Sequence, residues 1–174
     1  MGGADKGLLD FHGRPLVAHV IERLIPQVDT LLISANRNLD DYLDFGFPVV
    51  TDASIERLGP LAGIAAGLQA CETPWLLVCP CDCPALPVDL ASRLLQGAIE
   101  ANASLAVAGT AEGLQPTFQL CRRDRLPALT DYLATGERKV RGWCLAQKAV
   151  EVFFKDAAAF RNLNTPGDLK LMQP

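Results

Sequence analysis

The sequence predicts a doubly wound α/β fold with a mostly parallel sheet, built as one domain over residues 1–174. Apolar runs bounded by turn residues alternate with helical patterns, which is typical of βαβ units. The run at residues 75–79 is almost entirely apolar, as expected for a strand in the middle of a parallel sheet. A chain of 174 residues with 49% hydrophobic residues is also long enough to bury a core.

The first half of the chain supplies the regular alternation. A helix at 15–25 is expected from its apolar period and from Pro15, which suits a first helical position. A short helix at 40–45 ends at Gly46, and a third at 61–71 is rich in Ala and Gly, which favours close packing. Expected strands lie at 31–33, 48–51 and 75–79, and the strands at 31–33 and 75–79 should be inner ones because they are so apolar.

The second half departs from a strict alternation. Helical patterns cover residues 87–101, 126–133 and 140–147, and strands are expected at 105–108, 117–120 and 150–154. Residues 160–163 are expected as a short strand at a sheet edge. Thr165 and Pro166 then mark the start of a final helix, as N-cap and first helical position.

Composition and charge exclude several function classes. A net charge of −4 and a pI near 5.1 argue against a broad nucleic-acid surface, which would need a surplus of Lys and Arg. No apolar run approaches the roughly 18 residues that cross a bilayer, and the first residues lack the apolar part of a secretory signal. We therefore expect a soluble, cytoplasmic protein that binds neither nucleic acid nor membrane.

The six cysteines are expected to be reduced thiols, most of them buried. Cys79, Cys81 and Cys83 are spaced by two, unlike the Cys-x-x-Cys pairs of zinc sites. The sequence has no second cysteine or histidine pair that would complete a set of zinc ligands. A zinc-stabilised protein is the alternative that these cysteines leave open. Buried free cysteines behave as small apolar residues, so the sequence predicts neither zinc nor disulfides.

Polar residues follow several of the expected strands. In open α/β sheets, ligands bind beyond the carboxyl ends of the strands. Asp82 comes soon after the apolar run at 75–79 and lies between two prolines, Pro80 and Pro84. A carboxylate at a rigid strand end suits Mg²⁺, which takes few protein carboxylates and completes its shell with water and phosphate oxygens. A turn or N-cap aspartate is the simpler alternative.

Two glycine-containing segments could contact phosphate. Lys6 follows Gly2-Gly3-Ala4-Asp5, where a lysine beside a glycine-rich loop can neutralise triphosphate charge, although the Walker A spacing is absent. The segment from Gly59 to Gly63 is a turn into a helix, and its N-terminus could hold an anion or simply allow close packing.

These segments together resemble the molybdenum cofactor guanylyltransferase (MobA) family over essentially the whole chain. The resemblance rests on Met-Gly-Gly-Ala-Asp-Lys-Gly-Leu at 1–8, Gly-Pro-Leu-Ala-Gly at 59–63, Cys-Pro-Cys-Asp-Cys-Pro at 79–84 and Asn-Leu-Asn-Thr-Pro at 162–166. Many nucleotidyltransferases share the Asp-Lys-Gly-Leu and Asp-x-Pro pieces. The other pieces are much more specific to this family.

The resemblance implies a three-layer fold of the nucleotide-diphospho-sugar transferase, Rossmann-like type, and the transfer of GMP from Mg-GTP to molybdopterin with release of pyrophosphate. It implies that Lys6 contacts the triphosphate and that Asp82 binds Mg²⁺, which makes these two the catalytic residues. It also implies that Asn36 and Asp52 contact the base or ribose of GTP. For the part of the site that faces molybdopterin, here called the pterin side, the resemblance implies less specifically Gly59, Gly63, Arg138, Asn162 and Asn164. Proteins that deliver the cofactor or mature molybdoenzymes are plausible partners by the same analogy.

The sequence departs from the family pattern at its start. Family members begin with a strand and a Leu-Ala-Gly-Gly loop that precede the segment matching Met1, so the first strand is expected to be missing and the chain to be truncated at its N-terminus. Two other functions remain open: a cytidylyltransferase of the same superfamily, and a nucleotide-binding module without catalysis.

Overall fold

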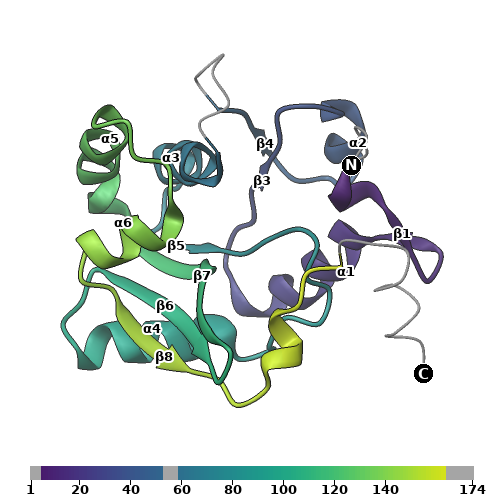
Figure 1. The fold of residues 1–174 in the computed structure, drawn as a ribbon. Coiled ribbons are helices and arrows are strands. Elements are labelled where there is room, and N and C mark those ends of the chain that lie inside the picture. Colours follow the sequence, from purple (N-terminus) through teal and green to yellow (C-terminus); the bar gives the residue numbers. More distant parts are fainter. Residues whose placement is uncertain (1–4, 53–58, 164–174) are drawn as a thin grey trace.

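The computed structural model describes residues 5–52 and 59–163 (Figure 1). Within these ranges, no helix is both long enough and apolar enough to cross a membrane. The α-helices and strands follow in the order β1 (Asp10–Phe11), β2 (Arg14–Pro15), α1 (Leu16–Leu24), β3 (Ile33–Ser34), α2 (Leu39–Leu43), β4 (Val49–Val50), α3 (Pro60–Ala70), β5 (Trp75–Val78), α4 (Leu90–Glu100), β6 (Leu105–Thr110), β7 (Gly113–Arg122), α5 (Leu126–Ala134), α6 (Val140–Ala146) and β8 (Val150–Phe153). The described residues also form 3₁₀ turns at Lys6–Leu8, Ile25–Gln27, Arg123–Arg125 and Ala157–Phe160.

The largest sheet has the strand order β5-β7-β6-β8. Strand β7 is antiparallel to β5 and to β6, whereas β6 and β8 are parallel, so β5, β6 and β8 all run in one direction. Strands β3 and β4 form a separate parallel pair, and β1 and β2 form a small hairpin. The predicted α/β class with a mostly parallel sheet is confirmed, and β7 is its one reversed strand among those of the large sheet.

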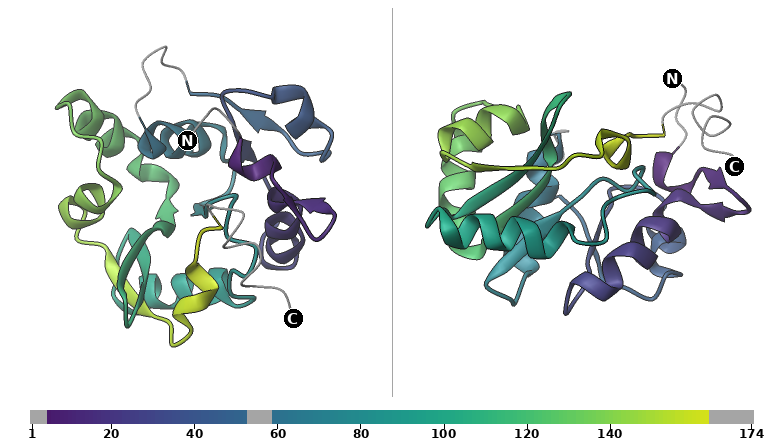
Figure 2. Two further views of the ribbon diagram at one scale, coloured as in Figure 1. Left: turned by 45° about the vertical axis from the view of Figure 1, so that its right-hand side comes forward. Right: turned by 90° about the horizontal axis from the view of Figure 1, so that it is seen from below.

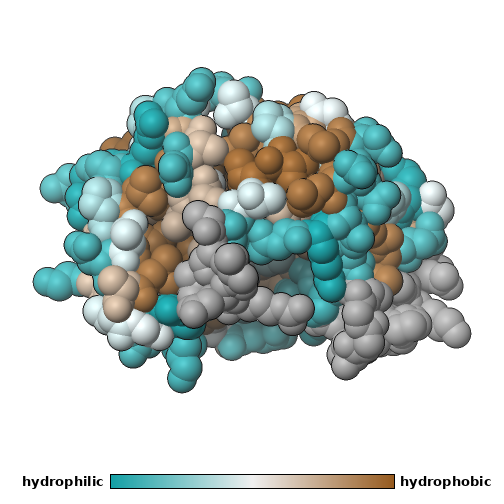
Figure 3. Space-filling view, turned by 90° about the horizontal axis from the view of Figure 1, so that it is seen from above, coloured by the Kyte–Doolittle hydropathy of each residue, from teal (hydrophilic) through white to brown (hydrophobic). Residues whose placement is uncertain are grey.

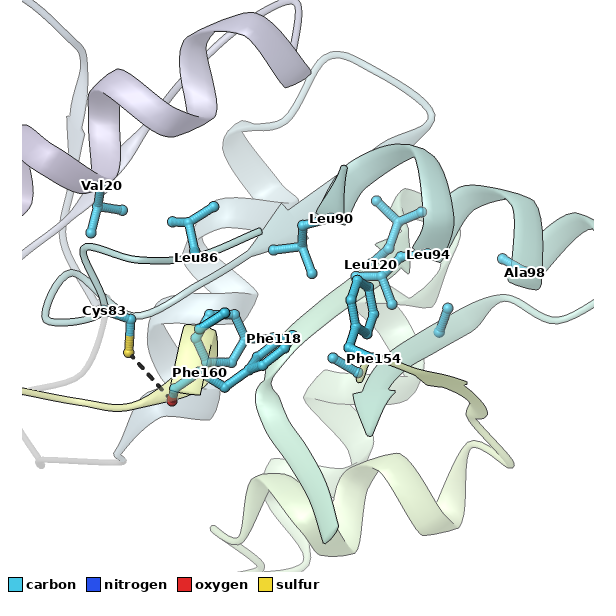
Figure 4. Packing of buried hydrophobic residues seen from close by; sticks show 13 residues of the cluster. Val20, Cys83, Leu86, Leu90, Leu94, Ala98, Phe118, Leu120, Phe154 and Phe160 are labelled. Carbon is cyan, nitrogen blue, oxygen red and sulfur yellow. Dashed lines mark hydrogen bonds between the residues drawn. The ribbon is translucent and has the colours of Figure 1, made fainter. Parts of the chain in front are cut away.

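Helices cover both faces of the large sheet (Figures 1 and 2). Alternate residues of β6 point to opposite faces, as the pleat requires: Ala106 and Ala108 belong to the core under α4, and Leu105 and Val107 to the core beneath α3, α5 and α6. The first core includes Phe118, Phe154 and Phe160, whose rings meet edge to face at 4.8 and 5.2 Å between centroids (Figure 4). This layering accounts for the three-layer arrangement expected from the sequence.

Two expectations about strands were wrong. The strands predicted as inner ones at 31–33 and 75–79 became β3 and β5, and each pairs along a single edge within the described residues. Residues 160–163 were expected to form an edge strand. Instead the 3₁₀ turn Ala157–Phe160 ends there, because the Asp156 carboxylate accepts a hydrogen bond from the Ala158 N–H at 3.0 Å and three alanines favour a helical turn. The final helix expected from Thr165 lies outside the described residues.

Candidate active site

Asp82 lies in the turn that follows β5 and is 5% exposed. The side-chain amide of Asn162 donates to both of its carboxylate oxygens, with Nδ2 at 3.1 Å from Oδ1 and 3.2 Å from Oδ2. The Cys83 thiol donates to Asn162 Oδ1 at 3.2 Å, which fixes the amide with its NH₂ group toward the carboxylate. The backbone N–H of Leu163 also donates to the Asp82 carbonyl at 2.9 Å. The C-terminal segment therefore holds the Asp82 turn in place.

Lys6 brings a positive charge to the same carboxylate, with Nζ 3.9 Å from Asp82 Oδ2, while half of its side chain remains exposed. The turn that carries it is held by Asp5, which accepts hydrogen bonds from the Tyr42 hydroxyl at 2.7 Å and from the Gly7 N–H at 3.3 Å. Gly7 is required there, because a Cβ at that position would lie 2.5 Å from the Tyr42 hydroxyl oxygen. These contacts place Lys6 beside Asp82.

Asn36 and Asp52 form a second polar pair, beyond the carboxyl ends of β3 and β4. Asn36 Nδ2 donates to Asp52 Oδ2 at 2.8 Å, and the Asp52 N–H donates to Asn36 Oδ1 at 2.9 Å. Asp52 Oδ1 is buried and accepts no hydrogen bond from the described residues. Such an acceptor costs free energy unless a partner arrives, so it points to a ligand with a hydrogen-bond donor.

Gly63 in the first turns of α3 lies against this pair. A Cβ on Gly63 would lie 2.8 Å from Ser34 Oγ and 3.7 Å from Asp52 Oδ1. A larger residue would therefore press on the Ser34 hydroxyl beside the polar pair, which gives Gly63 a role in shaping the site. Gly59 precedes α3 with φ of +73°, a conformation that favours glycine.

One cavity of about 950 Å³ joins these groups. Seven of the predicted site residues line it: Lys6, Asn36, Asp52, Gly59, Gly63, Asp82 and Asn162. Arg138 lies apart, in the connection between α5 and α6, where its Nη1 donates to the carbonyls of Leu133 and Glu137 at 2.7 and 2.8 Å. Asn164 is outside the described residues. The structure thus gathers most of the predicted site, and Asn162 lies against the predicted metal ligand.

The residues present suit a Mg²⁺ ion whose coordination shell is completed by phosphate oxygens of the substrate. A carboxylate accepts about four hydrogen bonds or ligands, and Asn162 occupies two of these positions on Asp82. Across residues 5–52 and 59–163, no group of three or more His, Cys, Asp or Glu side chains could hold a metal by itself. Because Mg²⁺ commonly uses one or two carboxylates together with phosphate oxygens, Asp82 fits such a shared site.

The thiols near the site are poor nucleophiles. Burial raises the pKa of Cys81 to about 11, and the neighbouring Asp82 carboxylate adds to the shift. Burial also raises the pKa of Cys79 to about 12. At neutral pH both are protonated, so the reactive thiolate form is scarce. All six cysteines are free, and the arrangement favours electrostatic positioning over covalent catalysis.

The sequence did not single out two residues that support the site. Tyr42 belonged to the short helix expected at 40–45, and Cys83 to the set of buried thiols. Each contacts a partner distant in sequence, Asp5 for Tyr42 and Asn162 for Cys83. No local pattern contains that information.

The sequence matches the MobA-like NTP transferase domain over residues 1–150. It is 46% identical over 175 residues to a protein of Cupriavidus taiwanensis named molybdenum cofactor guanylyltransferase. It is 48% identical over 179 residues to the protein of that name from Ralstonia nicotianae. Each match covers 98% of this chain and 88% of the relative.

Solved structures share the fold. Molybdopterin-guanine dinucleotide biosynthesis protein A from Archaeoglobus fulgidus superposes with a TM-score of 0.74 at 19% identity, covering 97% of this chain and 89% of that one. The 2-C-methyl-D-erythritol 4-phosphate cytidylyltransferase from Thermus thermophilus gives a TM-score of 0.73 at 18% identity, covering 95% and 91%. At these identities the likeness is one of fold alone.

Proposed function

Because the chain belongs to the MobA-like NTP transferase family, we propose that it transfers GMP from GTP to molybdopterin and releases pyrophosphate. The relatives from Cupriavidus and Ralstonia are named for this activity, and their similarity extends over nearly the whole chain. The observation that carries the proposal is the meeting of Asp82, Asn162 and Lys6 in the wall of the cavity that Asn36 and Asp52 also line. The proposal takes residues 1–174 as one cytoplasmic nucleotidyltransferase domain.

The reaction needs little covalent chemistry from the protein. An oxygen of the terminal phosphate of molybdopterin forms a bond to the α-phosphorus of GTP, and the bond from that phosphorus to the bridging oxygen of pyrophosphate breaks. No general base is required, because the attacking phosphate is ionised near neutral pH. Positioning and charge stabilisation are then the main contributions of the site.

The chain's own residues supply those contributions. Lys6, half exposed at the cavity, stabilises negative charge on the triphosphate. Asp82 would hold Mg²⁺, which when bound neutralises charge on phosphate oxygens, and Asn162 keeps both carboxylate oxygens oriented. Asp52 Oδ1, which accepts no hydrogen bond from the described residues, receives a donor from the guanine or ribose. Gly59, Gly63 and Arg138 remain assigned to the pterin side as part of the proposal, together with Asn164.

The test measures pyrophosphate release from GTP, CTP and ATP by the purified chain with molybdopterin and Mg²⁺. GTP should be the preferred substrate, and the Asp82→Ala variant supplies the background rate. Faster release from CTP would favour the cytidylyltransferase alternative. GTP binding without pyrophosphate release above that background would favour a nucleotide-binding module.

A further inference from the structure

Strand β7 contains a bulge where it pairs with β6. Val107 of β6 pairs with Gln119, but the next residue of β6, Ala108, pairs with Gln115, so the ladder skips residues 116–118. Bulges are common beside active sites, where they redirect a side chain. The skipped residues, here called the β7 bulge, are Pro116, Thr117 and Phe118.

Contacts on both sides of Thr117 hold the β7 bulge in shape. Gln119 is fully buried, and its Nε2 donates to the Pro116 carbonyl at 2.8 Å. The Phe118 ring packs edge to face on Phe160, with 4.8 Å between centroids (Figure 4). Gln119 Oε1 is buried and accepts no hydrogen bond from the described residues, which costs free energy. Stability alone therefore does not favour glutamine at this position, whereas its hold on the bulge does.

The hydroxyl of Thr117 is open to a ligand. Thr117 is half-buried and lines the cavity of about 950 Å³. Tyr42, Thr73 and Ser92 also line this cavity, and each donates its hydroxyl to an acceptor of the protein. The Thr117 hydroxyl makes no hydrogen bond with the part of the chain that the structure describes.

Thr117 lies at the same end of the sheet as Asp82. The ladder between β5 and β7 ends with Val78 opposite Gln119. Because the two strands are antiparallel, the residues ahead of Gln119 lie alongside the segment that follows Val78 and leads to Asp82. The β7 bulge also contacts the C-terminal segment that holds the Asp82 carboxylate. Thr117 therefore reaches the cavity near the proposed Mg²⁺ ligand.

The nucleoside pair lies on the other side of Asp82. Asn36 and Asp52 follow β3 and β4, which lie apart from β6, β7 and β8 in Figures 1 and 2. Strand β5 is the end strand of the large sheet and lines the cavity together with β3. Asp82 follows β5 and therefore lies between the nucleoside pair and Thr117. Since two substrates must occupy different parts of the cavity, the part near Thr117 is left for the acceptor.

Apolar side chains form much of the remaining cavity wall, among them Val20, Ile21 and Leu76. Figure 3 likewise shows apolar side chains gathered near the middle of the face seen from above, with hydrophilic side chains around them. In a site of this composition, a small number of polar groups fixes the orientation of the ligand. One hydroxyl in the right place is then enough to affect binding.

We propose that Thr117 binds the acceptor, donating its hydroxyl to the terminal phosphate of molybdopterin, and that Gln119 is a positioning residue that acts through the β7 bulge. The proposal rests on the proposed function, because it names a contact to the acceptor of that reaction. A phosphate oxygen accepts a hydrogen bond from a hydroxyl readily, since the phosphate is ionised near neutral pH.

The first experiment compares the parent chain with Thr117→Val, which removes the hydroxyl and keeps the branched shape, and with Thr117→Ser, which keeps the hydroxyl. Thr130→Val, on the exposed side of α5, is the matched control. Pyrophosphate release gives kcat and the KM for molybdopterin, and equilibrium binding without acceptor gives the Kd for GTP.

Thr117→Val should raise the KM for molybdopterin roughly 10-fold, the effect of losing a hydrogen bond to a charged group, and leave the Kd for GTP unchanged. Thr117→Ser should stay within a few-fold of the parent. An unchanged KM for molybdopterin in Thr117→Val would overturn the proposal, and so would an equal loss of GTP binding, which would assign the hydroxyl to the nucleotide. These outcomes differ from a parent chain that releases no pyrophosphate with molybdopterin, which would overturn the proposed function and this contact with it.

The second experiment tests Gln119 with Gln119→Met, which removes the amide and keeps an unbranched side chain of similar length. The KM for molybdopterin should rise as in Thr117→Val, again with GTP binding unchanged, a split that a general loss of stability does not produce. Because Gln119 acts through Thr117, the double variant should be no worse than the poorer single variant. Additive losses would overturn the positioning role. Thermal unfolding checks that each variant is folded, and Gln119→Leu takes the place of a Met variant that is not.

Discussion

Asn162 donates its side-chain amide to both oxygens of Asp82 across 80 residues of sequence, at 3.1 and 3.2 Å. Asp82 is 5% exposed, so most of its carboxylate's interactions come from the protein. A buried carboxylate is costly unless it is hydrogen-bonded or paired with a cation. Asn162 and Lys6 together meet that requirement and leave part of the carboxylate available to a metal ion.

The Asn162→Ala variant should lower kcat roughly 10- to 100-fold and raise the Mg²⁺ concentration needed for half-maximal activity. The reason is that hydrogen bonds to a charged group contribute about 1.5–3 kcal/mol, and the freed carboxylate can turn away from the metal. Steady-state kinetics across a Mg²⁺ series measure both effects. Gln96→Ala, on the exposed side of α4, is the matched control. An unchanged Mg²⁺ dependence in Asn162→Ala would show that the residue does not position Asp82.

The Asp82→Ala variant should lose at least about 10²–10³-fold in GMP transfer, the size of effect seen when one electrostatic stabiliser of a transition state is removed. The variant should still fold cooperatively in the absence of nucleotide, because Asp82 itself contributes no side chain to the two hydrophobic cores on the faces of the large sheet. The Asp131→Ala change on exposed α5 controls for loss of a carboxylate. Activity within a few-fold of the parent would remove Asp82 from the mechanism.

The Lys6→Ala variant should bind GTP about 10–150-fold more weakly, which corresponds to a charge-assisted hydrogen bond of 1.5–3 kcal/mol. Because phosphate oxygens are common to all nucleotides, the ratios between GTP, ATP and CTP should not change. Competition binding with the three nucleotides measures this, and Lys155→Ala, at an exposed site after β8, is the control. A variant that lost only guanine preference would contradict a phosphate role for Lys6.

Local sequence patterns predicted where the strands lie better than they predicted which strands pair with each other. The apolar run at 75–79 correctly predicted β5, because a strand of four apolar residues is encoded locally. Its position at an edge depends on which segment pairs with it, and no property of residues 75–79 contains that information. The reversed strand β7 is likewise set by its pairing with β5 and β6 rather than by its own composition.

The same holds for the candidate site: local motifs identified several of its residues, but not the contacts between them. Asp82 and Lys6 could be selected because each belongs to a short recognisable motif, and the structure places them 3.9 Å apart. Asn162 was also selected from a motif, but toward the pterin side, and its contact with Asp82 emerges only when the C-terminal segment folds back beside the β5 turn. Asp5 and Tyr42 meet through packing between a turn and α2, 37 residues apart.

Stability should fall in alkaline solution because several thiols have raised pKa values. Burial raises the pKa from 9.0 to about 12 for Cys121 and to about 11 for Cys144. The unfolded chain then releases these protons at lower pH than the folded chain. The contribution of the two thiols to the free energy of unfolding is therefore fully present below about pH 9 and is lost as pH rises toward 11–12. Urea unfolding at pH 8 and pH 10.5 measures the fall. Cys144→Ala should show a shallower fall, and an identical pH dependence would exclude this thiol as a cause.

The Asp52→Asn variant tests the buried oxygen that has no hydrogen-bond donor among the described residues. Replacing the carboxylate removes a charged acceptor, so the KM for GTP should rise roughly 10-fold or more, while the dependence on Mg²⁺ stays as in the parent. The nucleotide series then assigns the contact. If Asp52 accepts hydrogen bonds from the guanine, the preference for GTP over ATP should shrink. If it accepts a hydrogen bond from a ribose hydroxyl, the binding of all nucleotides should weaken together, and the 2′-deoxy or 3′-deoxy form of GTP should already bind the parent weakly.

Asp40→Asn, on exposed α2, is the control for loss of a carboxylate. An unchanged KM for GTP would mean that Asp52 Oδ1 stays without a partner in the complex and that the nucleotide lies elsewhere in the cavity.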